Sequence, residues 1–254
     1  RGHEVIYQQP FGVITTASEK AYPVDYSHFN IMGTAVGAHG IAADSDRAIF
    51  PAVNLEVRFG RDDAIRFRYP WVISGIGSTD IARVNWEGMA IGAAISGTMA
   101  VVGENVCGMD PAATFTNGHI GRSPELERRV RIFQDWYDGH GAVVVQYNVE
   151  DGRMGVPEYA IEKLGVQVIE AKWGQGAKDI GGEVKLPSLD RAMTLKKRGY
   201  LVLPDPEVAA NQEAYKIGAI QEFERHSRLG MVEAEAFIKE VARLRSLGAK
   251  YVTL

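Results

Sequence analysis

The stretch AVVVQYNVEDGRMGVPEYAIEKLGVQVIEAKW, from Ala142 to Trp173, decides the fold. It opens with an apolar run over Ala142–Asn148 and closes with a second run over Val166–Trp173, both typical of strands buried on two faces. Between them, Pro157–Leu164 has the pattern of a short helix, with proline in its first turn and a glycine directly after it. A strand, a helix and a strand in this order predict parallel neighbours joined by a crossover helix.

The same alternation extends through the rest of the chain. Further strands are expected at Trp71–Gly77, Thr98–Glu104 and Lys250–Leu254, and further helices at Ser78–Ser96, Ser123–Asp138, Leu186–Arg198 and Val232–Leu247. Polar residues follow the strand ends, which is where (β/α)8 barrels build their sites. The sequence therefore predicts an α/β fold of the TIM-barrel type, with five strands and so only about the first half of the barrel.

A doubly wound sheet is the alternative α/β architecture. Its dinucleotide fingerprint is incomplete here, because Gly75-Ile-Gly77 is followed by Asp80 where the third glycine should stand.

Residues 1–69 have no sustained periodicity and are expected to form an irregular or β-rich N-terminal cap. Within it, Asn54–Pro70 alternates apolar and polar residues and predicts a hairpin that turns at Gly60–Asp63. The expected domains are thus a cap over 1–69 and a barrel part over 70–254. The chain begins with Arg1 rather than methionine and closes on a strand-like segment, so we expect a processed or split polypeptide.

Composition excludes several classes of protein. With a net charge of −4 and no basic run, the 254-residue chain does not resemble a nucleic-acid-binding protein. Its one cysteine, Cys107, excludes an internal disulfide and a self-contained cysteine-ligated metal site, and it suits the cytoplasm. The longest apolar run, Met89–Val102, is too short for a membrane span. No His-Glu-x-x-His spacing and no nucleophile elbow is present, so no metal site is expected.

The segment AKWGQGAKDIGGEV, from Ala171 to Val184, combines two lysines and a glutamine with closely spaced glycines. Glycines let backbone N–H groups approach an anion, and the lysines supply positive charge. This combination indicates a site for a small anionic ligand.

The longer run from Asp151 to Pro187 resembles the FMN-binding synthase domain of the glutamate synthase family. In that family, Ser-Gly-Arg-Phe-Gly-Val precedes a strand, and Lys-x-x-Gln-Gly-Ala-Lys-Pro-Gly-Glu-Gly-Gly follows it. This chain has Asp-Gly-Arg-Met-Gly-Val from Asp151 and Lys-Trp-Gly-Gln-Gly-Ala-Lys-Asp-Ile-Gly-Gly-Glu from Lys172. Weaker matches lie at Ser74–Asp80, Val102–Asp110 and Glu224–Val241. Residues 70–254 resemble most closely the first half of the barrel in stand-alone glutamate-synthase-like flavoproteins, which lack a glutaminase domain.

The resemblance implies an FMN-dependent oxidoreductase that reduces an imine, formed from a 2-oxo acid and ammonia, to an amino acid. It implies an electron-donor protein, an oligomeric complex, and a second chain or C-terminal half that completes the barrel and holds the FMN phosphate. An iron–sulfur cluster, where the family has one, would be carried by that missing part.

Site residues follow from the same resemblance, position by position. Lys172, Glu104 and Gln175 are expected to be catalytic. Cofactor contacts are expected from Ser74, Gly75, Ile76, Gly77, Gln146 and Lys172, and substrate contacts from Glu104, Arg153, Gln175 and Lys178. Asn148 ends the same strand as Gln146 and is the alternative flavin contact.

Each of these residues also has a simpler structural interpretation. Lys172 and Lys178 could be paired surface lysines, Glu104 could pair with Arg153 or Lys172, and Arg153 could only pin its loop. Ser78 or Thr79 could cap a helix, Cys107 could be a small buried residue, and Trp86, Trp136 and Tyr137 are expected in the core.

Two other functions stay open on the sequence alone. The same flavin barrel could oxidise a 2-hydroxy acid or another amino acid. Identifying the substrate that reacts with the flavin would distinguish this chemistry from imine reduction. A half-barrel could also be a binding or structural subunit of a larger complex, and a missing flavin spectrum would favour that alternative.

Overall fold

The computed structural model describes residues 55–61, 64–172, 184–226 and 234–253. The compact unit that contains the sheet begins at Leu55, so the hairpin expected before Pro70 belongs to it. The first 54 residues of the expected cap over 1–69, and the candidate residues Gln175 and Lys178, lie outside the described ranges.

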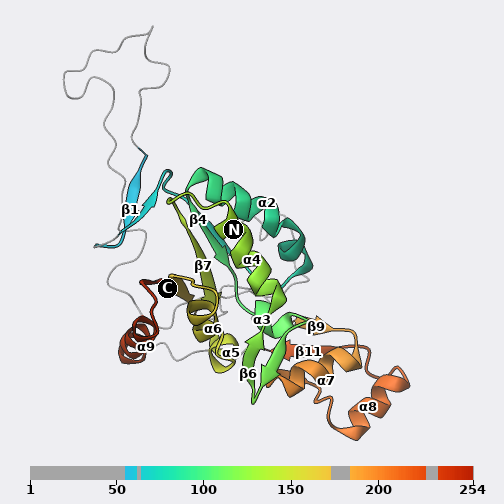
Figure 1. Ribbon diagram of the computed structural model, residues 1–254. Coiled ribbons are helices and arrows are strands. Elements are labelled where there is room, and N and C mark those ends of the chain that lie inside the picture. The colour runs from blue at the N-terminus through green and yellow to red at the C-terminus, as the bar shows by residue number, and fades with distance from the viewer. Residues whose placement is uncertain (1–54, 62–63, 173–183, 227–233, 254) are drawn as a thin grey trace, which may run out of the picture. The chain divides into compact units, whose positions relative to one another are not determined.

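A five-stranded sheet forms the centre of the fold, and each pair of neighbours in it is parallel (Figure 1). Its strands, in spatial order, are β3 (Val72–Ile76), β4 (Met99–Val102), β7 (Ala142–Tyr147), β8 (Val168–Ala171) and β12 (Tyr251–Thr253). The predicted parallel α/β sheet and its strands are therefore confirmed. The spatial order follows the chain order without the reversal that a doubly wound sheet requires, so that alternative does not fit the described strands.

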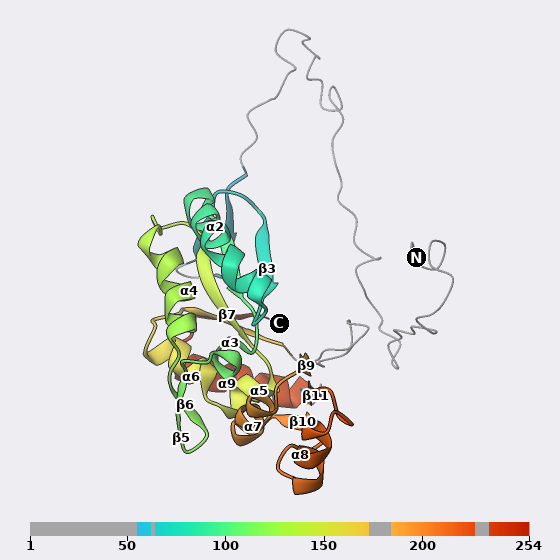
Figure 2. The same cartoon turned by 90° about the vertical axis from the view of Figure 1, so that its right-hand side faces the viewer.

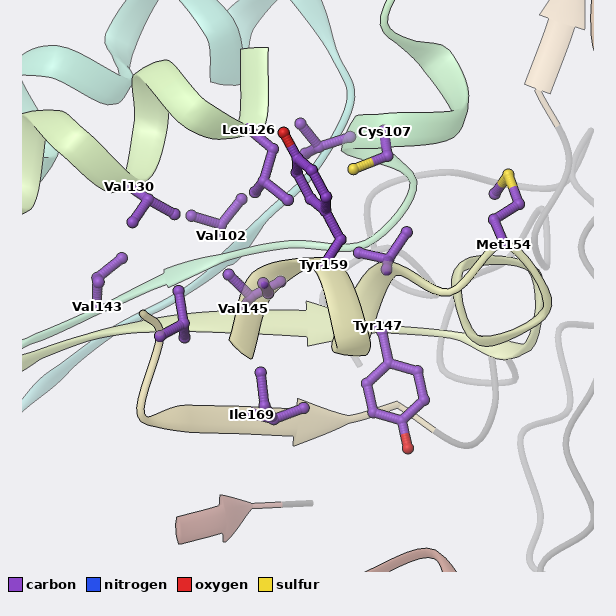
Figure 3. Close-up of a cluster of buried hydrophobic side chains, with 14 of the residues drawn as sticks. Val102, Cys107, Leu126, Val130, Val143, Val145, Tyr147, Met154, Tyr159 and Ile169 are labelled. Atoms are coloured by element: carbon purple, nitrogen blue, oxygen red, sulfur yellow. The ribbon is translucent and has the colours of Figure 1, made fainter. Parts of the chain in front are cut away.

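Helices cover one face of this sheet, which we call the helix face. They are α2 (Asp80–Ser96), α4 (Pro124–Asp135), α6 (Val156–Glu162) and α9 (Ala234–Ser246). The side chains of Thr79 and Ser123 cap α2 and α4, as serine and threonine do in this position. Figure 3 shows how Val102, Val145 and Ile169 of the sheet gather with Leu126 and Val130 of α4 and Tyr159 of α6.

A two-stranded hairpin packs on the opposite face, which we call the hairpin face. Strands β1 (Val57–Phe59) and β2 (Ile65–Phe67) pair antiparallel, as the alternating pattern predicted. Phe67 is buried there against alternate residues of the sheet, namely Met99, Val101, Val144 and Val168. Side chains two positions apart on a strand share a face. Gln146, Glu170 and Thr253 therefore continue the hairpin face toward the carboxyl ends of the strands.

A second, antiparallel sheet is inserted between β8 and β12 (Figure 2). Its strand order is β10 (Leu201–Leu203), β11 (Phe223–His226), β9 (Val184–Leu186), and it carries α7 (Leu189–Lys197) and α8 (Ala209–Lys216). Of these elements only α7 was predicted. Each of these strands has only three or four residues and, unlike β1 and β2, does not lie in a longer alternating segment. The same holds for the hairpin of β5 (Thr114–Thr116) and β6 (His119–Arg122), and for the short helices α3 (Val106–Met109) and α5 (Val149–Arg153).

Two arginines at the two ends of α7 bind the last carbonyl groups of α3. Arg191 donates to the carbonyl oxygen of Met109 at 2.5 Å, and Arg198 donates to those of Gly108 and Asp110 at 2.6 and 2.9 Å. Carbonyls at a helix end lack partners within the helix and carry partial negative charge, so guanidinium groups satisfy both needs. The inserted sheet is thereby bound to the segment that follows β4.

The structure tests four residues that were expected to be buried. Trp86 and Cys107 are buried, as predicted. The prediction for Trp136 and Tyr137 was wrong, because they are 52% and 51% exposed. α4 ends at Asp135, before both aromatic residues, so they leave the helical face that would have carried them into the core. None of the helices in the described ranges combines the length and the apolar character needed to span a bilayer.

Candidate functional site

An ion pair joins the carboxyl ends of two strands of the parallel sheet. The ammonium of Lys172, directly after β8, lies 3.0 Å from each carboxylate oxygen of Glu104, which stands two residues after β4. The side chains are 25% and 11% exposed, so the pair is largely shielded from water. The simpler interpretation of Glu104, pairing with Lys172, is thus confirmed. The sheet brings together two residues that are 68 positions apart in the sequence.

Two glycines hold the backbone of Glu104 close to the end of β3. A Cβ atom on Gly77 would lie 2.6 Å from the carbonyl oxygen of Glu104, and one on Gly103 would lie 2.6 Å from the amide nitrogen of Gly77. Gly103 also donates a backbone hydrogen bond to Ile76 at 2.9 Å. Only glycine permits this close approach of the two backbones. The approach fixes the position of the Glu104 backbone, from which its carboxylate extends.

The carboxylate of Asp151 binds the backbone of the residue that follows Glu104. Asn105 follows Glu104 with a φ of 65°, in the left-handed region, and its N–H donates to the carboxylate of Asp151 at 2.7 Å. Asp151 is 1% exposed and also closes the capping box of α5 with Asn148. Burial raises the pKa of Asp151 to about 7, although the N–H groups of Asn105 and Asn148 act in the opposite direction. A buried carboxyl group that titrates near neutrality thus lies under the loop that carries Glu104.

The predicted cofactor-binding segment, Ser74 to Gly77, lies at the carboxyl end of β3. Ser74 and Gly75 are exposed, whereas Ile76 and Gly77 are partly buried. The guanidinium of Arg129, itself 1% exposed, donates to the carbonyl oxygens of Ile76 and Gly77 at 3.1 and 2.8 Å. Its remaining bond is a 2.8 Å contact with Glu125. Arg129 was not predicted as a site residue, because nothing local distinguishes it from the other arginines of α4.

Gln146 and Asn148, the two alternatives for a flavin contact, have different roles. The side chain of Asn148 accepts the N–H of Asp151 at 3.0 Å and so caps α5. Gln146 lies on the hairpin face and donates to Glu170 at 2.5 Å, and Thr253 donates to the other oxygen of Glu170 at 3.1 Å. Asn148 is therefore used as a helix cap, and the amide nitrogen of Gln146 is used within the sheet. The flavin contact of Gln146 stays a prediction. Glu170 was missed, since a single glutamate in an apolar strand has no distinctive spacing.

Arg153 forms one contact within α5 and one with the backbone that follows α7. Its guanidinium donates to Glu150 at 2.7 Å and to the carbonyl oxygen of Gly199 at 3.2 Å, and its side chain is 47% exposed. These contacts are those expected of an arginine that pins its loop. The role of substrate contact stays a prediction.

A pocket of about 750 Å³ opens beside these strand ends, between the first turns of α2 and α4 and the end of α3. Three arginines and three acids line it, namely Arg83, Arg129, Arg191, Asp80, Asp110 and Glu125. The two signs of charge balance, and Arg129, Arg191 and Glu125 already bind protein groups. The pocket contains none of the residues predicted to bind cofactor or substrate.

Among the described residues, no group of three or more His, Cys, Asp and Glu side chains is placed to hold a metal ion. In comparisons with protein families, with curated proteins and with solved structures, no match to this chain is found.

Proposed function

We propose that this protein is an FMN-dependent oxidoreductase of the glutamate synthase type, which reduces the imine of a 2-oxo acid to an amino acid. The observation that carries the proposal is the ion pair of Lys172 and Glu104 at the carboxyl edge of the parallel sheet. Both residues occupy positions of the family motifs, and this edge is where parallel α/β folds bind ligands.

The strand order supports a barrel as the complete architecture. The five parallel strands stand in chain order, with the sheet-packing helices on one face, as in the first five units of a (β/α)8 barrel. The two outer strands, β3 and β12, each pair with one neighbour among the described residues. Further β/α units, from the same polypeptide or a second chain, complete the barrel and supply the loops that hold the FMN phosphate.

The residues at the strand ends fit the ring and the substrate. Lys172 supplies a cation for an anionic flavin or a substrate carboxylate, and Gly75 leaves exposed backbone without a side chain beside Gln146. When bound, FMN supplies the electrons for the reduction, which it receives from a partner protein in the cytoplasm.

Within this site, Lys172 and Glu104 contact different groups of the substrate. The ammonium of Lys172 binds a carboxylate of the 2-oxo acid, and at ~4 Å such a contact supplies about 4 kcal/mol at an effective dielectric constant near 20. When the substrate carboxylate shares the ammonium of Lys172, the carboxylate of Glu104 accepts a hydrogen bond from the substrate nitrogen. This hydrogen bond keeps the proton on that nitrogen. Its fixed backbone beside Gly77 keeps this carboxylate in one place.

Spectroscopy of the purified protein tests the proposal. We expect a yellow protein that releases FMN, not FAD, on denaturation. After anaerobic photoreduction, 2-oxoglutarate with ammonium should reoxidise the flavin, and neither compound alone should do so. Bleaching of the oxidised flavin by a 2-hydroxy acid would replace imine reduction by the alternative chemistry. A colourless protein that takes up no FMN, even with its co-purifying chains, would contradict a flavin function altogether.

A further inference from the structure

Tyr200, which lies between α7 and β10 of the inserted sheet, reaches the loop that carries Glu104. Its hydroxyl donates a hydrogen bond to Oδ1 of Asn105 at 3.2 Å, across 95 positions of the sequence. Tyr200 and Asn105 are 2% and 4% exposed, so water does not compete for this bond. Burial raises the pKa of Tyr200, and its hydroxyl therefore keeps the proton that it donates.

Asn105 is held at two of its atoms by two different parts of the fold. Its backbone N–H donates to the carboxylate of Asp151 at 2.7 Å, while its side chain accepts from Tyr200. Its φ of 65° lies in the left-handed region, which asparagine adopts more readily than most residues but still at a cost in energy. Two buried hydrogen bonds therefore stabilise a turn that the backbone alone would not favour, directly after Glu104.

The ring of Tyr200 is itself confined. A Cβ atom on Gly108 of α3 would overlap with the hydroxyl of Tyr200, so glycine at this position lets the phenol reach Asn105. The guanidinium of Arg225 on β11, a residue that is 3% exposed, lies over the ring at 5.1 Å from its centroid, within cation–π distance. The inserted sheet therefore determines where the hydroxyl of Tyr200 lies.

The turn at Asn105 controls the direction of the Glu104 side chain. Gly77 and Gly103 hold the backbone of Glu104 against the end of β3, and the turn holds the peptide that follows. With both sides held, the carboxylate of Glu104 stays 3.0 Å from the ammonium of Lys172. If the turn relaxed to ordinary backbone, the peptide after Glu104 would rotate and the carboxylate would move with it.

We propose that Tyr200 is a positioning residue that acts on Glu104 through Asn105, so that the inserted sheet directs the carboxylate that meets the substrate nitrogen. The inference rests on the proposed function, because that function assigns the substrate nitrogen to Glu104. Loss of the Tyr200 hydroxyl should therefore impair the use of ammonium. It should spare the binding of the 2-oxo acid, which Lys172 contacts, and the binding of FMN.

Tyr200→Phe tests this division because it removes the hydroxyl and keeps the ring. The assay follows reoxidation of photoreduced FMN in the full-length protein, together with its co-purifying chains. At saturating 2-oxoglutarate, the rate constant for ammonium should fall about 3- to 10-fold, the value of one hydrogen bond. The half-saturating concentration of 2-oxoglutarate and the Kd for FMN should be unchanged. An equal loss in all three constants would show a general structural effect and overturn the inference.

Tyr215→Phe is the matched control for loss of a tyrosine hydroxyl. Tyr215 lies on α8 of the same inserted region, and its hydroxyl donates to the carbonyl oxygen of Pro187 at 2.8 Å. This bond lies within the inserted region and does not involve Asn105, so its loss should leave all three constants at their wild-type values. A loss of ammonium use in Tyr215→Phe as large as in Tyr200→Phe would contradict a specific role for Tyr200.

Asn105→Gly tests the same hydrogen bond from its other end. Glycine accepts left-handed backbone but offers no side chain for Tyr200 to bind. This variant should reproduce the loss seen in Tyr200→Phe, and the double variant should lose little more than either single one, because both remove the same bond. Losses that multiply in the double variant would refute the link. If Tyr200→Phe does not fold, Asn105→Gly still gives the answer, since it leaves the buried phenol in place.

Hydrogen exchange distinguishes failure of this inference from failure of the proposed function, because it needs no turnover. The N–H of Asn105, bound to Asp151, should exchange about 3- to 10-fold faster in Tyr200→Phe than in wild-type protein or Tyr215→Phe. The amide of Val101 in β4 should keep its rate in all three. An unchanged rate at Asn105 would overturn the inference even in an active flavoprotein. Faster exchange in a protein that takes up no FMN would overturn the proposed function and leave Tyr200 only as the residue that holds the turn.

Discussion

Gly77 lies so close to Glu104 that a Cβ atom at position 77 would stand 2.6 Å from the carbonyl oxygen of Glu104. The ends of β3 and β4 therefore touch through backbone alone, and the position of the candidate carboxylate depends on this contact.

Gly77→Ala should destabilise the protein by about 1–3 kcal/mol, the usual cost of overpacking, because backbone cannot move aside as a side chain can. Gly88→Ala is the matched control. Gly88 lies within α2 with nothing within 4 Å of its added Cβ, so alanine there should stabilise the protein by roughly 0.5–1 kcal/mol. Urea denaturation of both variants measures the two effects. A neutral Gly77→Ala would mean that the strand ends can separate without cost.

Lys172→Met should reduce turnover about a hundredfold or more while the protein remains folded, because one preorganised charge near developing charge commonly contributes that much. Lys185→Met is the control, since Lys185 forms an ion pair with Glu222 at 2.6 Å but its side chain is 71% exposed. Steady-state rates of imine reduction and circular dichroism compare the two variants. Wild-type rates in Lys172→Met would leave the ion pair with Glu104 as a purely structural contact.

Arg129→Met should cost about 1–3 kcal/mol of stability, because the carbonyl groups of Ile76 and Gly77 lose their buried donor. Glu125 keeps its ion pair with Arg128 at 2.9 Å. Arg131→Met, two residues along the same helix and exposed, should change stability by no more than about 0.5 kcal/mol. Thermal unfolding distinguishes the two. If both substitutions had the same small effect, the guanidinium of Arg129 would not be what holds the end of β3.

Asp151 makes stability depend on pH, and the raised pKa gives the sign. The unfolded carboxyl group ionises near pH 4 and the folded one near pH 7, so the folded protein holds the extra proton between these values. The contribution of Asp151 is fully present below about pH 4 and is lost as the pH rises toward about 7, by an amount on the order of 4 kcal/mol. Asp151→Asn should abolish this dependence.

Urea denaturation between pH 4.5 and 7.5 measures the effect of Asp151→Asn, and wild-type protein should lose its advantage over the variant as the pH rises. Asp135→Asn, at an exposed position at the end of α4, should keep the pH dependence of the wild type. Parallel curves for wild type and Asp151→Asn would show that Asp151 is already ionised in the folded state at low pH.

The parts of the fold that could be predicted from the sequence are those with a local cause. Continuous apolar runs revealed the parallel strands, and Thr79 and Ser123 indicated the starts of α2 and α4 through their capping side chains. Trp136 shows the limit of periodicity. Its spacing continues the helical pattern, but α4 ends at Asp135, and the N–H of Trp136 bonds to the carbonyl of Phe133, three residues back.

The candidate site was predictable only where a motif lies within one segment. Lys172 and Glu104 came from motifs at strand ends, and the sequence left Lys172 and Arg153 as alternative partners of Glu104. The strand order of the sheet decides for Lys172. The roles of Glu170 and Asp151 depend on partners in other segments. Glu170 meets Gln146 through the register of β7 and β8, and Asp151 meets the amide of Asn105, 46 positions away.

The two arginines of α7 that bind the end of α3 have a consequence for how the protein opens. Separating the inserted sheet from the segment after β4 would expose the carbonyl groups that Arg191 and Arg198 now satisfy. We therefore expect the two regions to unfold together as one cooperative unit, although neither contributes a strand to the other. Hydrogen exchange should then show the amide hydrogens of β10 and of α3 protected to the same degree and released in the same opening event.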